Sequence, residues 1–249
     1  MGGIVTAFRT LTILPIPGVD ARSPASALYW FPAVGLVIGC MQFGAAAAAS
    51  FLCLDRWPEL AALAAVGTGV LLTRGFHLDG LSDWADSFGS IADRDRMLAI
   101  MKDSRVGVFG VLALTLQLLS KWILITQLME MNAPGWLIAA GIISRAMQVE
   151  MASSAPYARP EGGLGLAFVS GSNRRHRITA LVFSLFITVC SFGAAGLAVF
   201  LAGLVVCRMM VRSSRRRLGG VTGDLLGACS EWVETAVLLT AALISLHSR

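Results

Sequence analysis

The stretch 107–128, which reads GVFGVLALTLQLLSKWILITQL, decides the fold class of this chain. Lys121 is its only charged residue. A helix of about 20 apolar residues crosses the hydrocarbon core of a bilayer, which is about 30 Å thick. The stretch therefore predicts a membrane-spanning helix. Because strand-like alternation of polar and apolar residues is weak, a β-barrel is not expected.

The rest of the chain has the same apolar character. Of its 249 residues, 56% are hydrophobic and 14% are charged, and the mean hydropathy is +0.73. Soluble domains carry roughly 25% charged residues, so lipid must cover most of this surface. We predict an all-α, polytopic transmembrane helical bundle of about seven spans, within a range of six to eight, as one integral membrane domain over residues 1–249. The expected spans are roughly 32–54, 60–76, 107–128, 135–153, 178–193, 195–211 and 232–246.

Charge placement favours this topology. Gly193 and Gly196 are the only turn signal between the fifth and sixth spans, and one long tilted helix is the alternative. With seven spans and a cytoplasmic N-terminus, 16 of the 20 basic residues fall in cytoplasmic segments, as the positive-inside rule requires. We therefore expect a bacterial inner (plasma) membrane protein whose active site faces the cytoplasm. Orientation and anionic membrane lipid account for the net charge of +5, so no nucleic-acid partner is expected.

The longest polar stretch, 74–106, is expected to be a cytoplasmic catalytic loop. Within it, Asp79, Asp83 and Asp86 have the spacing i, i+4, i+7, which places them on one face of a helix. Three like charges on one face must be neutralised. Mg²⁺, which prefers carboxylates and phosphates as ligands, would do this. The alternative is a solvated acidic face paired with nearby cations, namely Arg94, Arg96 or Lys102.

Two further residues suggest chemistry but allow a structural interpretation. His77 has the pKa range of a general base or could orient a metal ligand, and the alternative is a hydrogen-bonded histidine at the membrane interface. Arg145 falls near the middle of the span 135–153, where an arginine needs a partner. It would contact either a substrate phosphate or carboxylate, or pair with Glu150.

Two segments next to spans carry further charged residues. Lys102, Asp103 and Arg105 precede the span 107–128, where a helix start and an arginine favour phosphate binding. A basic flank that only sets orientation is the alternative. Near the C-terminus, an acidic set shares one helical face, and its alternative is a helix start capped by Thr222. This set is Asp224, Glu231 and Glu234.

Several short segments together resemble the cobalamin synthase family, in their order as well as their content. They are LTILPIP at 11–17, YWFPAVG at 29–35, HLDGLSDWAD at 77–86, MKDSRVG at 101–107, SR at 144–145, YAR at 157–159, GLG at 163–165 and GVTGDLLGA at 220–228. The resemblance covers nearly the whole chain. One departure is Arg74, where the family pattern leads us to expect glycine.

The resemblance implies an enzyme, an adenosylcobinamide-GDP ribazoletransferase. Such an enzyme joins α-ribazole or its 5′-phosphate to adenosylcobinamide-GDP, releases GMP, and forms adenosylcobalamin or its 5′-phosphate, with Mg²⁺ as the cofactor. The catalytic residues implied are His77, Asp79, Asp83 and Asp86. The metal ligands implied are Asp79, Asp83, Asp86 and Asp224. The substrate-binding residues implied are Lys102, Asp103, Arg105, Arg145, Arg159, Asp224, Glu231 and Glu234.

Two other classes of polytopic membrane protein also use acidic residues. Enzymes that transfer a CDP-activated alcohol have Asp-Gly followed by Ala-Arg, whereas Asp79-Gly80 is followed here by Leu-Ser-Asp. A transporter would place acids near the bilayer midplane, whereas most acids here fall in expected loops or at the ends of spans. The sequence leaves open the lower base, the number of metal ions and whether the chain forms a homo-oligomer.

Overall fold

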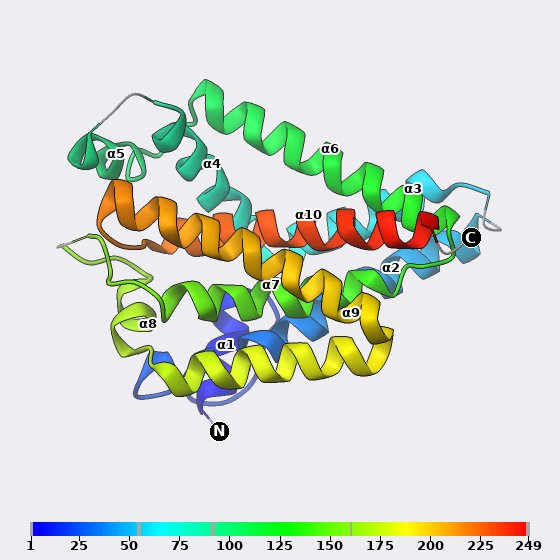
Figure 1. Cartoon of the computed structure of the whole chain (residues 1–249), viewed down its shortest axis with the longest axis horizontal. Helices are drawn as coiled ribbons and strands as arrows, with labels where there is room; N and C mark the ends of the chain where they lie inside the picture. The colour runs from blue at the N-terminus through cyan, green and yellow to red at the C-terminus, as the bar shows by residue number, and fades with distance from the viewer. Residues whose placement is uncertain (1, 54–55, 91–92, 160, 248–249) are drawn as a thin grey trace.

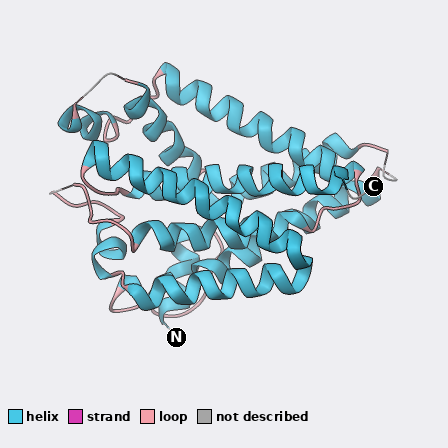
Figure 2. Cartoon of the chain, in the orientation of Figure 1, coloured by secondary structure: helices cyan, strands magenta, loops and turns pink. Residues whose placement is uncertain are grey.

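The computed structural model describes residues 2–53, 56–90, 93–159 and 161–247. All regular elements in these ranges are helices, and no strand occurs among them, so the predicted all-α class is confirmed (Figures 1 and 2). The elements are α1 (Gly2–Leu11), η1 (Pro24–Trp30), α2 (Phe31–Leu52), α3 (Pro58–Thr73), α4 (Phe76–Gly89), α5 (Arg94–Ile100), α6 (Val108–Glu130), α7 (Trp136–Ala152), α8 (Leu166–Gly171), α9 (Arg174–Leu218) and α10 (Gly223–His247).

The described chain contains helices that could span a membrane, but fewer of them than predicted. Four helical stretches of the described chain are long and apolar enough to cross a bilayer, and a fifth counts if α3 and α4, bent by 88°, form one span. The prediction of seven spans is therefore too high by this measure. The span expected at 60–76 ends at Thr73, and α7 has only 17 residues and carries Arg145 and Glu150. The α9 helix is counted once here, although its 45 residues cover the two spans expected at 178–193 and 195–211. The four stretches are Pro24–Leu52, Val108–Glu130, Arg174–Leu218 and Gly223–His247.

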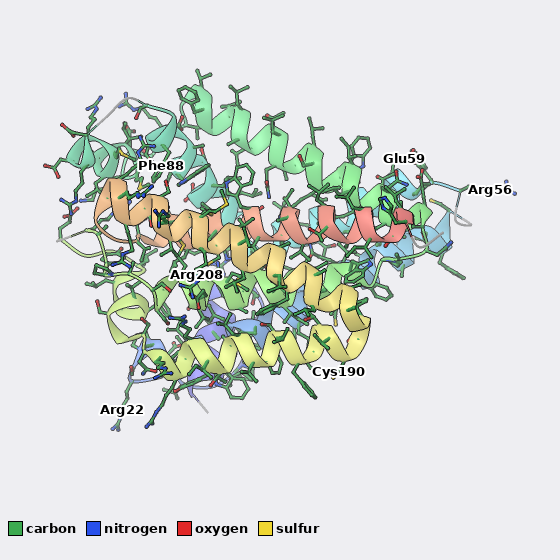
Figure 3. All side chains as sticks on the ribbon, in the orientation of Figure 1. Arg22, Arg56, Glu59, Phe88, Cys190 and Arg208 are labelled. Atoms are coloured by element: carbon green, nitrogen blue, oxygen red, sulfur yellow. The ribbon has the colours of Figure 1, made fainter. Side chains whose placement is uncertain are left out.

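The α9 helix reverses direction at Gly193, which has φ 57° and ψ −133°. Its two arms run in opposite directions and diverge from this turn in Figure 1, and Cys190 lies near the turn in Figure 3. Arg177 of the first arm and Arg208 of the second both bind the buried carboxylate of Glu150 on α7, at 2.8 Å each. The expected turn is thus confirmed, and the alternative of one long tilted helix is wrong.

The segment 74–106, expected to be a catalytic loop, is largely helical. It contains α4 and α5, and α4 packs closely against α10. A Cβ atom on Gly80 would lie 2.6 Å from the carbonyl oxygen of Asp224, and one on Gly227 would lie 3.2 Å from the Cα of His77. Glycine at these two crossings lets the backbones approach. The predicted acids therefore sit on a packed helix rather than on a free loop.

Four buried charged side chains lie at the centre of the bundle. Lys121 of α6 donates to Glu231 Oε2 at 2.6 Å and also to Glu234, both on α10. Arg145 of α7 binds the other carboxylate oxygen of Glu234. Its second terminal nitrogen lies 3.3 Å from His77 Nδ1 on α4. The two cations and two carboxylates of this network cancel in charge. Because they come from α6, α7 and α10, their contacts hold these three helices together beneath α4.

Replacing Glu234 by glutamine should strongly destabilise the bundle. The change leaves the buried cations Lys121 and Arg145 to share one carboxylate, and breaking a buried ion pair costs about 3–5 kcal/mol. Unfolding in detergent micelles should show this loss. A second change, Arg145→Gln, restores charge balance and should recover part of it. A single variant as stable as the wild type would contradict the network.

Replacing Gly80 by alanine should separate α4 from α10. The added Cβ meets backbone of Asp224, which cannot rotate away, and overpacking of this kind costs about 1–3 kcal/mol. Gly44→Ala on α2 is the matched control, because no described atom lies within 4 Å of its Cβ position. The melting temperature should fall for Gly80→Ala and stay level or rise for Gly44→Ala. Equal values for the two variants would rule out the close crossing.

Candidate active site

A cavity of about 720 Å³ opens between the start of α4, the start of α10, α1 and α8. Its walls are mostly apolar, and a few polar groups interrupt them, as is usual for small-molecule sites. Phe31 and Phe168 contribute apolar surface, and Asp79 and Ser82 face the cavity from α4. The cavity thus lies beside the strongest motif in the sequence.

Two of the predicted aspartates are free of partners. Asp79 is exposed on the cavity wall, and Asp83, one turn further along α4, is half-buried. Neither carboxylate makes a hydrogen bond or an ion pair with any residue that the structure describes. Lys102, proposed above as a pairing cation, binds Glu161 instead. These two carboxylates are therefore available to bind a cation.

Asp86 has a different position from the one that the spacing suggested. Its Oδ2 accepts the backbone N–H of Gly107 at 2.7 Å, and its Oδ1 accepts that of Gly110 at 2.8 Å. These N–H groups lie at the start of α6, where a carboxylate stabilises unpaired donors and the helix dipole. Asp86 therefore caps α6 from a neighbouring helix, and both of its oxygens are already engaged.

Asp224 in the first turn of α10 lies next to the α4 acids. Its carboxylate accepts a hydrogen bond from Arg159, and it interacts electrostatically with Asp79 and Asp83. Thr222 caps α10 by accepting the N–H of Leu225 at 3.3 Å, as the alternative interpretation of this segment proposed. In the ranges that the structure covers, no group of three or more His, Cys, Asp or Glu side chains is gathered to hold a metal. The protein alone does not offer a closed metal cage there.

Of the predicted basic residues, Arg159 contacts the site at Asp224, while Lys102 and Arg105 pair with other carboxylates. Arg105 binds Asp103 with two nitrogens, at 2.9 and 2.6 Å. Hydrogen bonds from the side chain and then the backbone of Arg105 lower the pKa of Asp103 to about 2. The Lys102 ammonium lowers the pKa of Glu161. These exposed pairs are local, so an incoming phosphate has to exchange with a resident carboxylate.

Four predicted site residues lie in the interior instead. His77, Arg145, Glu231 and Glu234 belong to the buried network and are absent from the cavity wall as described. His77 is 1% exposed, and its Nε2 has no partner among the described residues. Arg145 pairs with Glu234, so the expected alternative pair with Glu150 is wrong. These side chains hold α4 and α10 in place and do not meet a ligand in the cavity.

Some residues of the site and its support were missed from the sequence. Arg9 and Arg74 line the cavity, although Arg74 had been noted only as a departure from the family pattern. Gln117 donates to Glu231 Oε2 at 3.1 Å and to Thr235 Oγ1 at 2.9 Å. The sequence did carry a signal for this contact, because Gln117 and Lys121 are polar residues four positions apart inside an apolar span.

The sequence matches the family model described as cobalamin-5-phosphate synthase over residues 3–242. Three similar proteins are each named adenosylcobinamide-GDP ribazoletransferase. That of Chlorobium phaeobacteroides is 42% identical and aligned over 100% of both chains, and that of Chlorobaculum tepidum is 46% identical over 98% of this chain and 96% of its own. That of Syntrophobacter fumaroxidans is 38% identical over 96% and 97%.

No solved structure matches this chain. The family model, however, extends over almost all of the residues, and it includes every candidate site residue from His77 to Glu234. The relatives are aligned over nearly their full length as well. The resemblance first drawn from short motifs is therefore confirmed, and the chain belongs to the cobalamin-5-phosphate synthase family.

Proposed function

We propose that this chain joins α-ribazole, or its 5′-phosphate, to adenosylcobinamide-GDP and releases GMP, with Mg²⁺ as the cofactor. The observation that carries the proposal is the pair of carboxylates without a hydrogen-bond or ion-pair partner among the described residues: Asp79 on the wall of a cavity of about 720 Å³, and Asp83 one turn further along α4. Both lie in the HLDGLSDWAD segment that the family resemblance singled out. The relatives' shared name supplies the substrates.

The donor set fits Mg²⁺. This ion is usually held by one or two carboxylates together with waters and substrate phosphates, so a closed protein cage is not required. Asp79 and Asp83 would supply these carboxylates, and Asp224 would add a third once Arg159 turns to a phosphate. When bound, the ion would neutralise charge on the diphosphate of the donor.

The reaction breaks a phosphoanhydride bond and forms a phosphoester bond. The acceptor hydroxyl oxygen attacks the phosphorus nearer the corrinoid, the bond from that phosphorus to the oxygen bridging to GMP breaks, and GMP leaves with this oxygen. The hydroxyl proton passes to a carboxylate oxygen of Asp79 or Asp83, since buried His77 does not reach the cavity. Arg159 would steady phosphate oxygens. Such catalysis depends mostly on positioning and charge.

The contacts at the end of the bundle nearest the site support a cytoplasmic orientation. Arg94 of α5 donates to the carbonyl oxygens of Leu218 and Ala158, at 2.9 Å each, and Arg217 donates to that of Phe88 at 3.0 Å. Arg94 of α5, Arg217 of α9 and Arg159 thus lie at the end of the bundle that holds the site. Arg56, by contrast, lies at the opposite end (Figure 3). Basic ends favour the cytoplasmic side of the inner membrane.

Asp79→Asn and Asp83→Asn should each lower GMP release at least about 100-fold, because each removes a carboxylate that would hold the Mg²⁺ needed to neutralise the diphosphate. Purified protein would be incubated with adenosylcobinamide-GDP, either acceptor and Mg²⁺. A chelator should stop the reaction, and added Mg²⁺ should restore it. Asp95→Asn is the matched control and should keep full activity, because Asp95 is exposed and contacts Arg94 alone among the described residues.

The results of this experiment test the assignment of the metal ligands and the assignment of the reaction separately. Wild-type turnover in both aspartate variants would show that these carboxylates are not the metal ligands. If the wild-type protein releases no GMP with either acceptor, the assigned reaction itself is wrong.

A further inference from the structure

The backbone of Arg74 has a conformation that normally selects glycine. Arg74 ends α3 with φ 54° and ψ 26°, and Gly75 follows with φ 66°. Side chains with a Cβ adopt this left-handed conformation only at an energetic cost. Asn132 is the other non-glycine residue with positive φ in the described chain, and asparagine tolerates this region well. An arginine at this turn is therefore not explained by the needs of the backbone.

The side chain of Arg74 lies on the cavity wall without a partner. It is exposed, and no hydrogen bond or ion pair joins its guanidinium to any residue that the structure describes. Arg9, the second arginine on this wall, is fully engaged. It binds Asp20 Oδ2 at 2.8 Å and the carbonyl oxygens of Ile16 and Gly18 at 3.2 and 3.0 Å. Arg74 is thus the cavity cation that is free to receive an anion.

The cavity therefore has two charged positions of opposite sign. Asp79 lies on the wall, and Asp83 follows one turn further along α4. Arg74 lies at the turn before this helix, with apolar residues such as Phe76 and Leu78 also on the wall. The diphosphate of the donor belongs at the carboxylates, where a bound cation would neutralise it. A second phosphate, carried by the other substrate, would complement Arg74. Arginine binds phosphate oxygens with two parallel N–H donors.

We propose that Arg74 binds a substrate phosphate, and that this phosphate is the 5′-phosphate of the ribazole acceptor. The inference rests on the proposed function. The strained backbone supports it, because unusual backbone conformations are retained where the side chain has a role in binding or catalysis. The family description, cobalamin-5-phosphate synthase, names a phosphorylated product, and the relatives' name leaves the phosphate open. Arg74 thus makes this chain selective for the phosphorylated acceptor.

Arg74→Gly tests this directly, because glycine relieves the left-handed backbone. The variant should melt at or above the wild-type temperature, so a loss of activity cannot come from unfolding. Its KM for α-ribazole 5′-phosphate should rise at least about tenfold, the loss of one bidentate charged contact. Its KM for unphosphorylated α-ribazole should change less than about twofold. Arg74→Lys should keep part of the preference, and Arg56→Gly, exposed at the other end of the bundle, should keep all of it.

Calorimetry without the donor measures the binding of each acceptor, and this second test of the Arg74 contact does not depend on turnover. The dissociation constant of the phosphorylated acceptor should rise in Arg74→Gly by the same factor as its KM. Equal effects on both acceptors would overturn the proposal. A rise in the KM of adenosylcobinamide-GDP alone would place the donor diphosphate at Arg74 and overturn it too. If the wild type binds the phosphorylated acceptor through Arg74 but releases no GMP, the proposed reaction fails while this contact stands.

Discussion

Two cations inside an apolar bundle must each find a counter-charge, and this requirement fixes how α10 is rotated. Lys121 and Arg145 come from α6 and α7, and both bind Glu234. Glu231, three residues earlier on the same face of α10, shares Lys121. An unneutralised charge at this depth would be costly, so few other rotations of α10 are open to the chain. Asp224 lies on the same face seven residues before Glu231, and this rotation turns it toward Gly80 of α4.

The same electrostatic reasoning separates the supporting residues from the ligand-binding ones. In the interior, two cations and two carboxylates cancel and leave no charge for a ligand. On α4, neither Asp79 nor Asp83 forms an ion pair with a described residue, while Asp224 pairs with Arg159. Carboxylates of the same chain therefore differ in role according to whether the fold already balances their charge. Burial alone would not make this distinction, because Asp83 and Asp224 are both partly buried.

Sequence patterns predicted properties that depend on near neighbours and missed those that depend on distant ones. Apolar length predicted the helices, paired glycines predicted the turn in α9, and Thr222 was recognised as a cap. The role of Asp86 depends on N–H groups of Gly107 and Gly110, more than twenty residues away, so spacing within α4 could not reveal it. The span count was too high at α7, because apolar length suggested a span where the helix has only 17 residues and buries the charged side chains of Arg145 and Glu150.

His77 shows why proximity in sequence is a weak guide to a shared role. Successive residues on a helix point about 100° apart, so residues two positions apart face nearly opposite sides. His77 therefore turns inward to Arg145, while Asp79 turns to the cavity. The bend of 88° between α3 and α4 makes this arrangement possible, since it directs α4 away from the path of α3. A continuous helix through residues 58–89 would carry Asp79 and Asp83 along the path of α3, where unpaired carboxylates are costly. The left-handed turn at Arg74 thus serves the carboxylates through geometry and, through its own side chain, supplies the opposite charge on the same wall.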